Sequence, residues 1–226
     1  MAEKSELTAL AGARACLYRF LGSIYIMEID EKMLGNIKEM KFPQELPEED
    51  LQEGYDLIRA YAASNGVDSL EDLAADYAKI FLAAGEAQGL AAFPYESVYT
   101  GKRHEFMGDA QQEVKALYVA RGWEPKKDMF RIMEDHIGLE LEFMAVLCEE
   151  LKKAVEEEAK DRIAPVLEEQ RTFLRNHLLN WTSSFTSDVC KYAQTDFYKG
   201  AAKVTGGFLK LEKQLLDMGG AAWDIE

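Results

Sequence analysis

Apolar side chains recur every three or four residues along most of the chain, which is the spacing of one buried helix face. The clearest run covers residues 5–28, where one polar residue, Arg14, interrupts the apolar stripe. Helical spacing also covers residues 48–64 and 70–81, and a short helix can begin after Asp30, a residue type that caps helices. No stretch longer than a few residues alternates apolar and polar positions as a half-buried strand does.

The second half of the chain follows the same pattern. Asp128 can cap a long helix that runs towards Lys160, and two further helices are predicted from apolar positions within residues 166–185 and 189–215. Pro165 suits the first turn of a helix or a break between two helices. The pattern therefore predicts an all-α fold.

We expect one multi-helix domain over residues 1–226, because there is no internal repeat and no low-complexity linker. Residues 1–125 and 126–226 could form two subregions of this domain.

Residues 83–101 are the longest stretch without a clear period, and they contain several aromatic residues. A long loop in a helical protein is usually a packed lid or a binding element. Its aromatic side chains either pin it to the core or form an apolar shelf for a peptide, beside which Glu96 offers a charge.

The charge balance narrows the class of partner. The chain has 26 Lys and Arg against 41 Asp and Glu, a formal net charge of −15. Nucleic acids and anionic lipids both attract clustered Lys and Arg, so neither is an expected partner. A hydrophobic content of 48% excludes a disordered acidic chain. A charged partner is therefore expected to be basic.

Neither the cysteines nor the N-terminus has the pattern expected of an exported protein. Cys16, Cys148 and Cys190 are widely spaced and form no CxxC pair, so we expect small core side chains rather than disulfides or a zinc site. The N-terminus lacks a basic start followed by an apolar run, and no apolar stretch reaches 18 residues. We expect a cytoplasmic location.

Residues 133–144 combine acidic side chains with a histidine. On a helix, His136 and Glu140 would project together from the apolar side, whereas Asp135 and Glu142 would point more nearly outwards. A buried carboxylate beside an imidazole needs a shared hydrogen bond or proton. The group is a structural pair, a site for a cationic ligand, or a metal or general-base site. Only three histidines occur in the chain, and no metal is expected.

Three short blocks follow one another along the chain: residues 76–81 (DYAKIF), 94–99 (PYESVY) and 134–144 (EDHIGLELEFM). Together they resemble the TorD/DmsD family of redox-enzyme maturation chaperones, which has an acidic–Tyr–x–x–Leu–Phe segment, a Pro–aromatic–x–Ser–Val–aromatic loop and an Asp–His helix. The tail from Phe173 to Tyr198 also fits, so the resemblance covers nearly the whole chain. Tyr95 stands where the family often has Trp, and Met133 where it often has Pro.

The resemblance implies an all-helical cytoplasmic chaperone of the TorD type, without enzymatic turnover. Its partners would be the twin-arginine signal peptide and the body of a molybdenum-containing reductase. It would hold the peptide until the molybdenum cofactor is inserted, which delays export. The chaperone would be a monomer or a helix-exchanged dimer. No cofactor is expected, although the resemblance alone allows a guanine nucleotide.

A twin-arginine peptide presents two guanidinium groups and then an apolar segment. Guanidinium groups suit carboxylates, and the apolar segment needs a groove. The predicted peptide-binding residues are Tyr77, Phe81, Pro94, Tyr95, Glu96, Ser97, Tyr99, Asp135, His136, Glu140 and Glu142.

Two other functions stay open at this point. One is a nucleotide- or metal-dependent hydrolase that uses Asp135, His136 and Glu140, although the chain has no GxGxxG, GxxxxGK[ST] or HExxH motif. The other is a general helical scaffold, which would not distinguish an Arg-Arg peptide from a Lys-Lys peptide.

Overall fold

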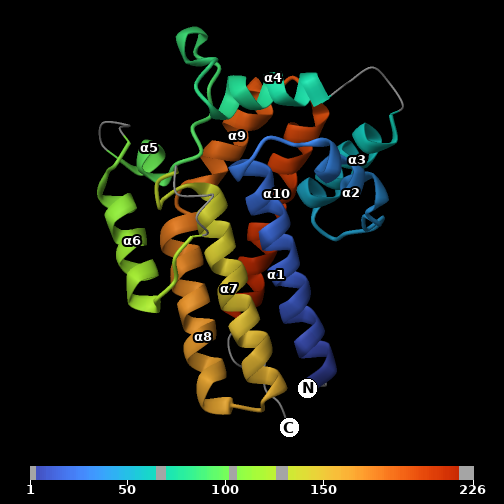
Figure 1. Ribbon diagram of the computed structural model, residues 1–226. Coiled ribbons are helices and arrows are strands. Elements are labelled where there is room, and N and C mark those ends of the chain that lie inside the picture. The colour runs from blue at the N-terminus through green and yellow to red at the C-terminus, as the bar shows by residue number, and fades with distance from the viewer. Residues whose placement is uncertain (1–3, 65–69, 102–105, 126–131, 219–226) are drawn as a thin grey trace. The chain divides into compact units, whose positions relative to one another are not determined.

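The computed structural model describes residues 4–64, 70–101, 106–125 and 132–218 (Figure 1). Within these ranges all regular structure is helical, apart from one isolated antiparallel bridge between Tyr95 and His136. The predicted all-α fold is therefore confirmed.

The helices follow one another in a simple order. They are α1 (Lys4–Ile26), α2 (Glu31–Glu39), α3 (Glu49–Ala63), α4 (Leu70–Phe81), the 3-10 turn η1 (Glu86–Gln88), α5 (Glu96–Thr100), α6 (Asp109–Arg121), α7 (Ile137–Glu156), α8 (Lys160–Phe173), the π-helical turn η3 (Leu174–Leu178), α9 (Thr182–Tyr192) and α10 (Asp196–Asp217). The first four lie within two residues of their predicted positions. Asp30 caps α2 as expected, because its side chain accepts the backbone N–H of Met33 at 2.7 Å.

The described chain divides into two compact units. Unit 1 comprises the described residues within 1–23, 95–180 and 209–226, and unit 2 comprises those within 24–94 and 181–208. The units interleave along the sequence, and neither is an N-terminal or C-terminal half. The single domain over residues 1–226 stays a prediction.

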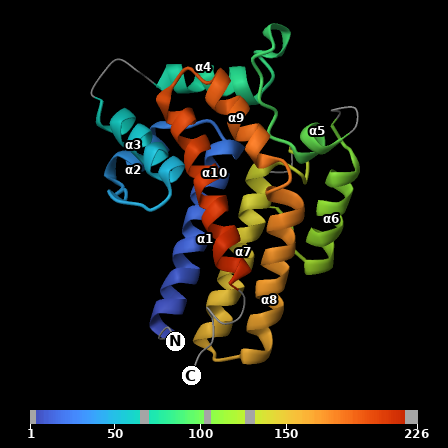
Figure 2. The same ribbon diagram turned by 180° about the vertical axis from the view of Figure 1, so that it is seen from behind.

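A buried polar cluster lies in the helical core of unit 1, in which α7 and α8 run side by side (Figures 1 and 2). The Arg14 guanidinium donates to both carboxylate oxygens of Glu212, each at 2.7 Å, and to the side-chain oxygen of Gln170 at 2.7 Å. The Tyr18 hydroxyl donates to Glu212 at 2.8 Å. The cluster explains the polar interruption at Arg14: this side chain is buried like Ala11 and Tyr18 on the same face, and its charge is paired inside the core.

Unit 2 has an aromatic core. The rings of Phe81 and Phe185 lie 5.6 and 5.4 Å from the Tyr25 ring, both in edge-on geometry, and the Tyr198 ring lies 5.6 Å from Phe81. α3 and α10 approach closely at Gly54. A larger residue would clash there, because its Cβ would lie 2.7 Å from the backbone nitrogen of Val204.

Some local expectations were wrong. Pro165 lies inside α8, beyond its first turn. The helix tolerates the proline because the missing N–H would have donated to the carbonyl of Asp161. This carbonyl lies near the exposed start of the helix, where water can donate a hydrogen bond to it instead. Cys148 is buried as expected, but Cys16 is exposed and Cys190 is partly buried.

In the parts of the chain that the structure describes, no helix is both long enough and apolar enough to span a bilayer.

Candidate functional site

Two of the three sequence blocks meet in unit 1. Tyr95 and His136 form the isolated bridge, and the backbone N–H of Glu96 donates to the carbonyl of Asp135 at 3.0 Å. The Asp135 carboxylate accepts the backbone N–H of Ser97 at 2.9 Å. Three successive residues at the start of α5, Tyr95, Glu96 and Ser97, are therefore held by contacts with Asp135 and His136.

His136 is not inside a helix, contrary to the sequence prediction. It is the N-cap of α7, and its Nδ1 accepts the backbone N–H of Gly138 at 3.0 Å, which places the ring proton on Nε2. The helix begins at Ile137 because the backbone before it is extended and pairs with Tyr95. Asp128, the predicted cap, lies outside the described residues.

Burial keeps the His136 ring neutral. The side chain is almost fully buried, which lowers its pKa to about 3. The Tyr95 ring packs edge-on against it with centroids 5.0 Å apart, and Tyr95 in turn meets Phe106 at 5.3 Å. A neutral ring acts here as a helix cap and a packing partner.

The carboxylates of this region differ in exposure. Asp135 was expected to point outwards, but it is fully buried because it precedes the helix, and burial, with a smaller contribution from nearby Glu96, raises its pKa. Glu140 is also fully buried. Glu142 is 14% exposed, and the Nε of Arg19 lies 3.3 Å from its carboxylate.

Glu96 makes a buried contact that sequence reasoning missed. Its carboxylate lies 3.0 Å from Nδ1 of His177 and accepts from the Asn180 side chain at 2.5 Å. Glu96 and His177 are both buried. His177, the one histidine in the segment from Phe173 to Tyr198, was the sequence feature that pointed to such a contact, since a buried imidazole needs a hydrogen-bond partner. This contact ties the start of α5 to η3.

Three predicted site residues, Tyr77, Phe81 and Pro94, belong to unit 2 and are buried there. The Tyr77 hydroxyl donates to the carbonyl of Tyr25 at 2.9 Å, and the Phe81 ring lies 5.2 Å from the Tyr77 ring. Packing in the aromatic core accounts for these residue types. In unit 1, Tyr95 and Tyr99 are partly exposed. A role of any of them in peptide binding stays a prediction.

The acidic residue of the first block has a local structural role. The Asp76 carboxylate accepts the backbone N–H groups of Gln194 and Thr195 at 2.8–3.0 Å and the Thr195 hydroxyl at 2.8 Å. It thereby fixes the residues that precede α10.

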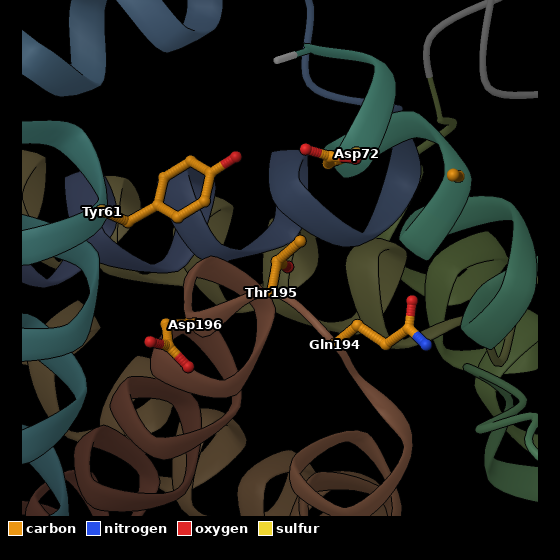
Figure 3. Close-up of a pocket in the computed structure, with 6 residues that line it drawn as sticks. Tyr61, Asp72, Gln194, Thr195 and Asp196 are labelled. Atoms are coloured by element: carbon orange, nitrogen blue, oxygen red, sulfur yellow. The ribbon is translucent and has the colours of Figure 1, made fainter. Parts of the chain in front are cut away.

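Beside this contact lies a polar cavity of about 320 Å³, lined by Tyr61, Asp72, Ala75, Gln194, Thr195 and Asp196 (Figure 3). Figure 3 shows the Tyr61 ring and the Asp72 carboxylate entering from separate helices, α3 and α4. None of the predicted site residues lines this cavity.

The described residues contain no group of three or more His, Cys, Asp or Glu side chains placed to hold a metal ion. Asp135, His136 and Glu140 therefore do not form the metal site that the hydrolase alternative would need.

Comparisons with known proteins agree with the sequence blocks. A family model described as nitrate reductase delta subunit matches residues 44–187, more than half of the chain. A chaperone protein TorD of Vibrio cholerae is 28% identical over 218 residues and covers 94% of this chain and 96% of its own. A chaperone protein TorD of Shewanella pealeana is 25% identical over 226 residues and covers 95% of each chain.

A solved structure of an Archaeoglobus fulgidus protein, assigned provisionally to redox enzyme maturation, is also similar. It is 18% identical, with a TM-score of 0.47, and the match covers 90% of this chain and 93% of that one. Because this TM-score is too low to support a fold assignment, the all-α fold is assigned from the helices of this structure alone. The predicted resemblance to the TorD/DmsD chaperones is confirmed by the sequence comparisons, and this chain belongs to the nitrate reductase delta subunit family.

Proposed function

We propose that this chain is a cytoplasmic chaperone that binds the twin-arginine signal peptide of a molybdenum-containing oxidoreductase and assists cofactor insertion before export. The observation that carries the proposal is the end-to-end match with relatives named chaperone protein TorD, which covers more than nine-tenths of both chains. The chaperone performs no turnover of its own and needs no bound cofactor. It acts as a monomer or a helix-exchanged dimer.

Charge and apolar contacts have different parts in this binding. The net charge of −15 attracts a basic peptide from solution and raises the rate of encounter. A partly exposed pair between a carboxylate and an arginine contributes at most about 1 kcal/mol. Apolar burial, at ~25 cal/mol per Å², must therefore supply most of the affinity.

The bridge between the 94–99 loop and the Asp135–His136 turn supports the proposal by its rigidity. Hydrogen bonds from the backbone N–H groups of Glu96 and Ser97 to Asp135 hold the loop in place, and the Tyr95 and Tyr99 side chains beside them are partly exposed. A preformed surface loses little conformational entropy when it binds an extended peptide.

The test is fluorescence anisotropy with a labelled synthetic peptide that has two consecutive arginines followed by an apolar segment. We expect saturable binding in the micromolar range or tighter, and weaker binding of the Lys-Lys version, because lysine lacks the planar fork of donors. Absence of binding would refute the proposal. Equal affinity for both peptides would instead indicate a general scaffold.

A variant test separates the site from the fold. Asp135→Ala with His136→Ala is expected to abolish binding, but it also removes a helix cap and a loop anchor. Asp135→Asn with His136→Asn keeps hydrogen-bond acceptors at both positions and serves as the folded comparison. Circular dichroism establishes which variants fold. Unchanged binding by a folded double-alanine variant would contradict the assignment of these two residues.

A further inference from the structure

Four of the exposed apolar residues of unit 1 lie on α6 or directly before it. Phe106 and Met107 precede this helix and are 45% and 69% exposed. Leu117 and Val119 lie on it and are 39% and 71% exposed. Single exposed apolar residues are ordinary, but Val119, the most exposed of the four, also lines a pocket, which makes that pocket a candidate interaction site.

A pocket of about 310 Å³ lies at the C-terminal end of α6, within unit 1. Its apolar wall consists of Tyr118, Val119, Trp123, Pro125, Ile132 and Leu139. The Trp123 ring stands edge-on to Tyr118 at 4.5 Å and lies 5.5 Å from Phe143, so the core holds the wall in place. This volume is at the lower end of the ~300–1,000 Å³ of ligand pockets and suits one or two apolar side chains.

The rim of the pocket is acidic. Glu134, Glu124 and Lys115 line it. Glu134 is paired with Lys115 at 2.8 Å; burial alone would raise its carboxyl pKa, but hydrogen bonds from Lys115 and Gln111 outweigh burial and lower it. Glu124 is exposed and makes no ion pair within the described ranges of the chain. Two carboxylates against one ammonium group favour a basic occupant and disfavour a phosphate-bearing one.

We propose that this pocket receives one or two side chains from the apolar segment of the signal peptide, while the arginines that precede the segment lie at the rim formed by Glu124 and Glu134. The inference rests on the proposed function and assigns the apolar contact to α6. It agrees with the burial of Tyr77 and Phe81, whose rings fill the core of unit 2. It also agrees with the burial of Asp135, since Glu124 and Glu134 are the more accessible carboxylates.

The experiment uses matched substitutions at exposed positions on α6 and directly after it. Val119→Asp places a charge at the mouth of the pocket, and Leu117→Asp places the same charge on α6 outside the lining. Glu124→Lys reverses a rim charge, and Glu113→Lys reverses an exposed charge on α6 away from the rim. Each variant is titrated with the labelled twin-arginine peptide and with a version whose apolar segment is replaced by Gly and Ser.

Val119→Asp should weaken binding of the full peptide about tenfold or more, which corresponds to ~1.4 kcal/mol, and leave the Gly/Ser version unchanged. Glu124→Lys should weaken both peptides, whereas the two control variants should bind like the wild type. Trp123 fluorescence should change on peptide addition, and Trp123→Phe should reduce that change, because Trp123 lines the pocket whereas Trp181 is buried.

The outcomes separate the two proposals. If the wild type binds the peptide and Val119→Asp binds equally well, the pocket assignment is overturned and the chaperone function stands. Equal losses in Val119→Asp and Leu117→Asp would also overturn it, because the effect would not be local to the pocket. If the wild type binds no twin-arginine peptide, the proposed function itself fails.

Discussion

Removing the buried charge of Arg14 should destabilise unit 1 strongly. Arg14→Met deletes both 2.7 Å hydrogen bonds to Glu212 and leaves that carboxylate in a site that is 2% exposed. Burial alone would lower the pKa of Arg14, but the Glu212 carboxylate outweighs it and raises the pKa, so the arginine is charged. Breaking a buried ion pair by removing one partner costs about 3–5 kcal/mol.

The melting temperature gives a second measure of the same loss. For a chain of this size each 1 kcal/mol lowers Tm by ~2–4 °C, so Arg14→Met should melt roughly 6–20 °C below the wild type. The assay is urea and thermal unfolding followed by circular dichroism. Arg59→Met is the control, because its 2.7 Å pair with Asp56 is exposed and should contribute less than about 1 kcal/mol.

A double variant distinguishes a buried charge from a lost packing contact. Arg14→Met with Glu212→Leu leaves no uncompensated charge and should recover most of the stability that Arg14→Met loses. The reasoning is refuted if Arg14→Met costs no more than Arg59→Met. It also fails if the double variant is as unstable as the sum of its two single variants.

Three further predictions concern single positions. Asp135→Asn keeps an acceptor for the Ser97 backbone amide and should stay within about 1 kcal/mol of the wild type, whereas Asp135→Ala should cost ~1–3 kcal/mol; urea titration compares them. Because burial lowers the pKa of His136 to about 3, the unfolded chain takes up that proton first, so stability should fall as pH drops from ~6.5 towards 3, by at most ~1.4 kcal/mol per pH unit. Urea titrations across pH should show a steeper loss of stability in the wild type than in His136→Asn. Gly54→Ala should destabilise the protein by ~1–3 kcal/mol despite the better helix propensity of alanine, since the new Cβ would lie 2.7 Å from the backbone. Gly35→Ala, whose Cβ meets nothing within 4 Å, should raise the free energy of unfolding by ~0.5–1 kcal/mol. Equal melting temperatures for the two variants would contradict this.

Local signals in the sequence predicted the helices well. The apolar stripe of residues 5–28 gave α1 within two residues at each end, and the Asp30 cap placed the start of α2. These features depend on neighbours three or four residues away, which a sequence shows directly. The three blocks that indicated the family are equally local.

Long-range contacts account for the features that sequence reasoning missed. Arg14 stood out as a polar interruption, but its partner Glu212 is 198 residues away, so no spacing rule could identify the pair. His136 was placed inside a helix because its periodicity was continuous, and the bridge to Tyr95 that delays the helix joins distant segments. The pairing of Glu96 with His177 has the same character.

The interleaving of the two units limits how this protein can be made. Domains usually fold one after another as the chain leaves the ribosome. Here unit 2 needs residues up to 208, and unit 1 needs residues beyond 208 that include Glu212. Almost the whole chain must therefore be synthesised before either unit can close its core. If synthesis stops before α10, both the aromatic core of unit 2 and the buried polar cluster of unit 1 are incomplete. Such a fragment would be degraded by proteases and would not work as half of a chaperone.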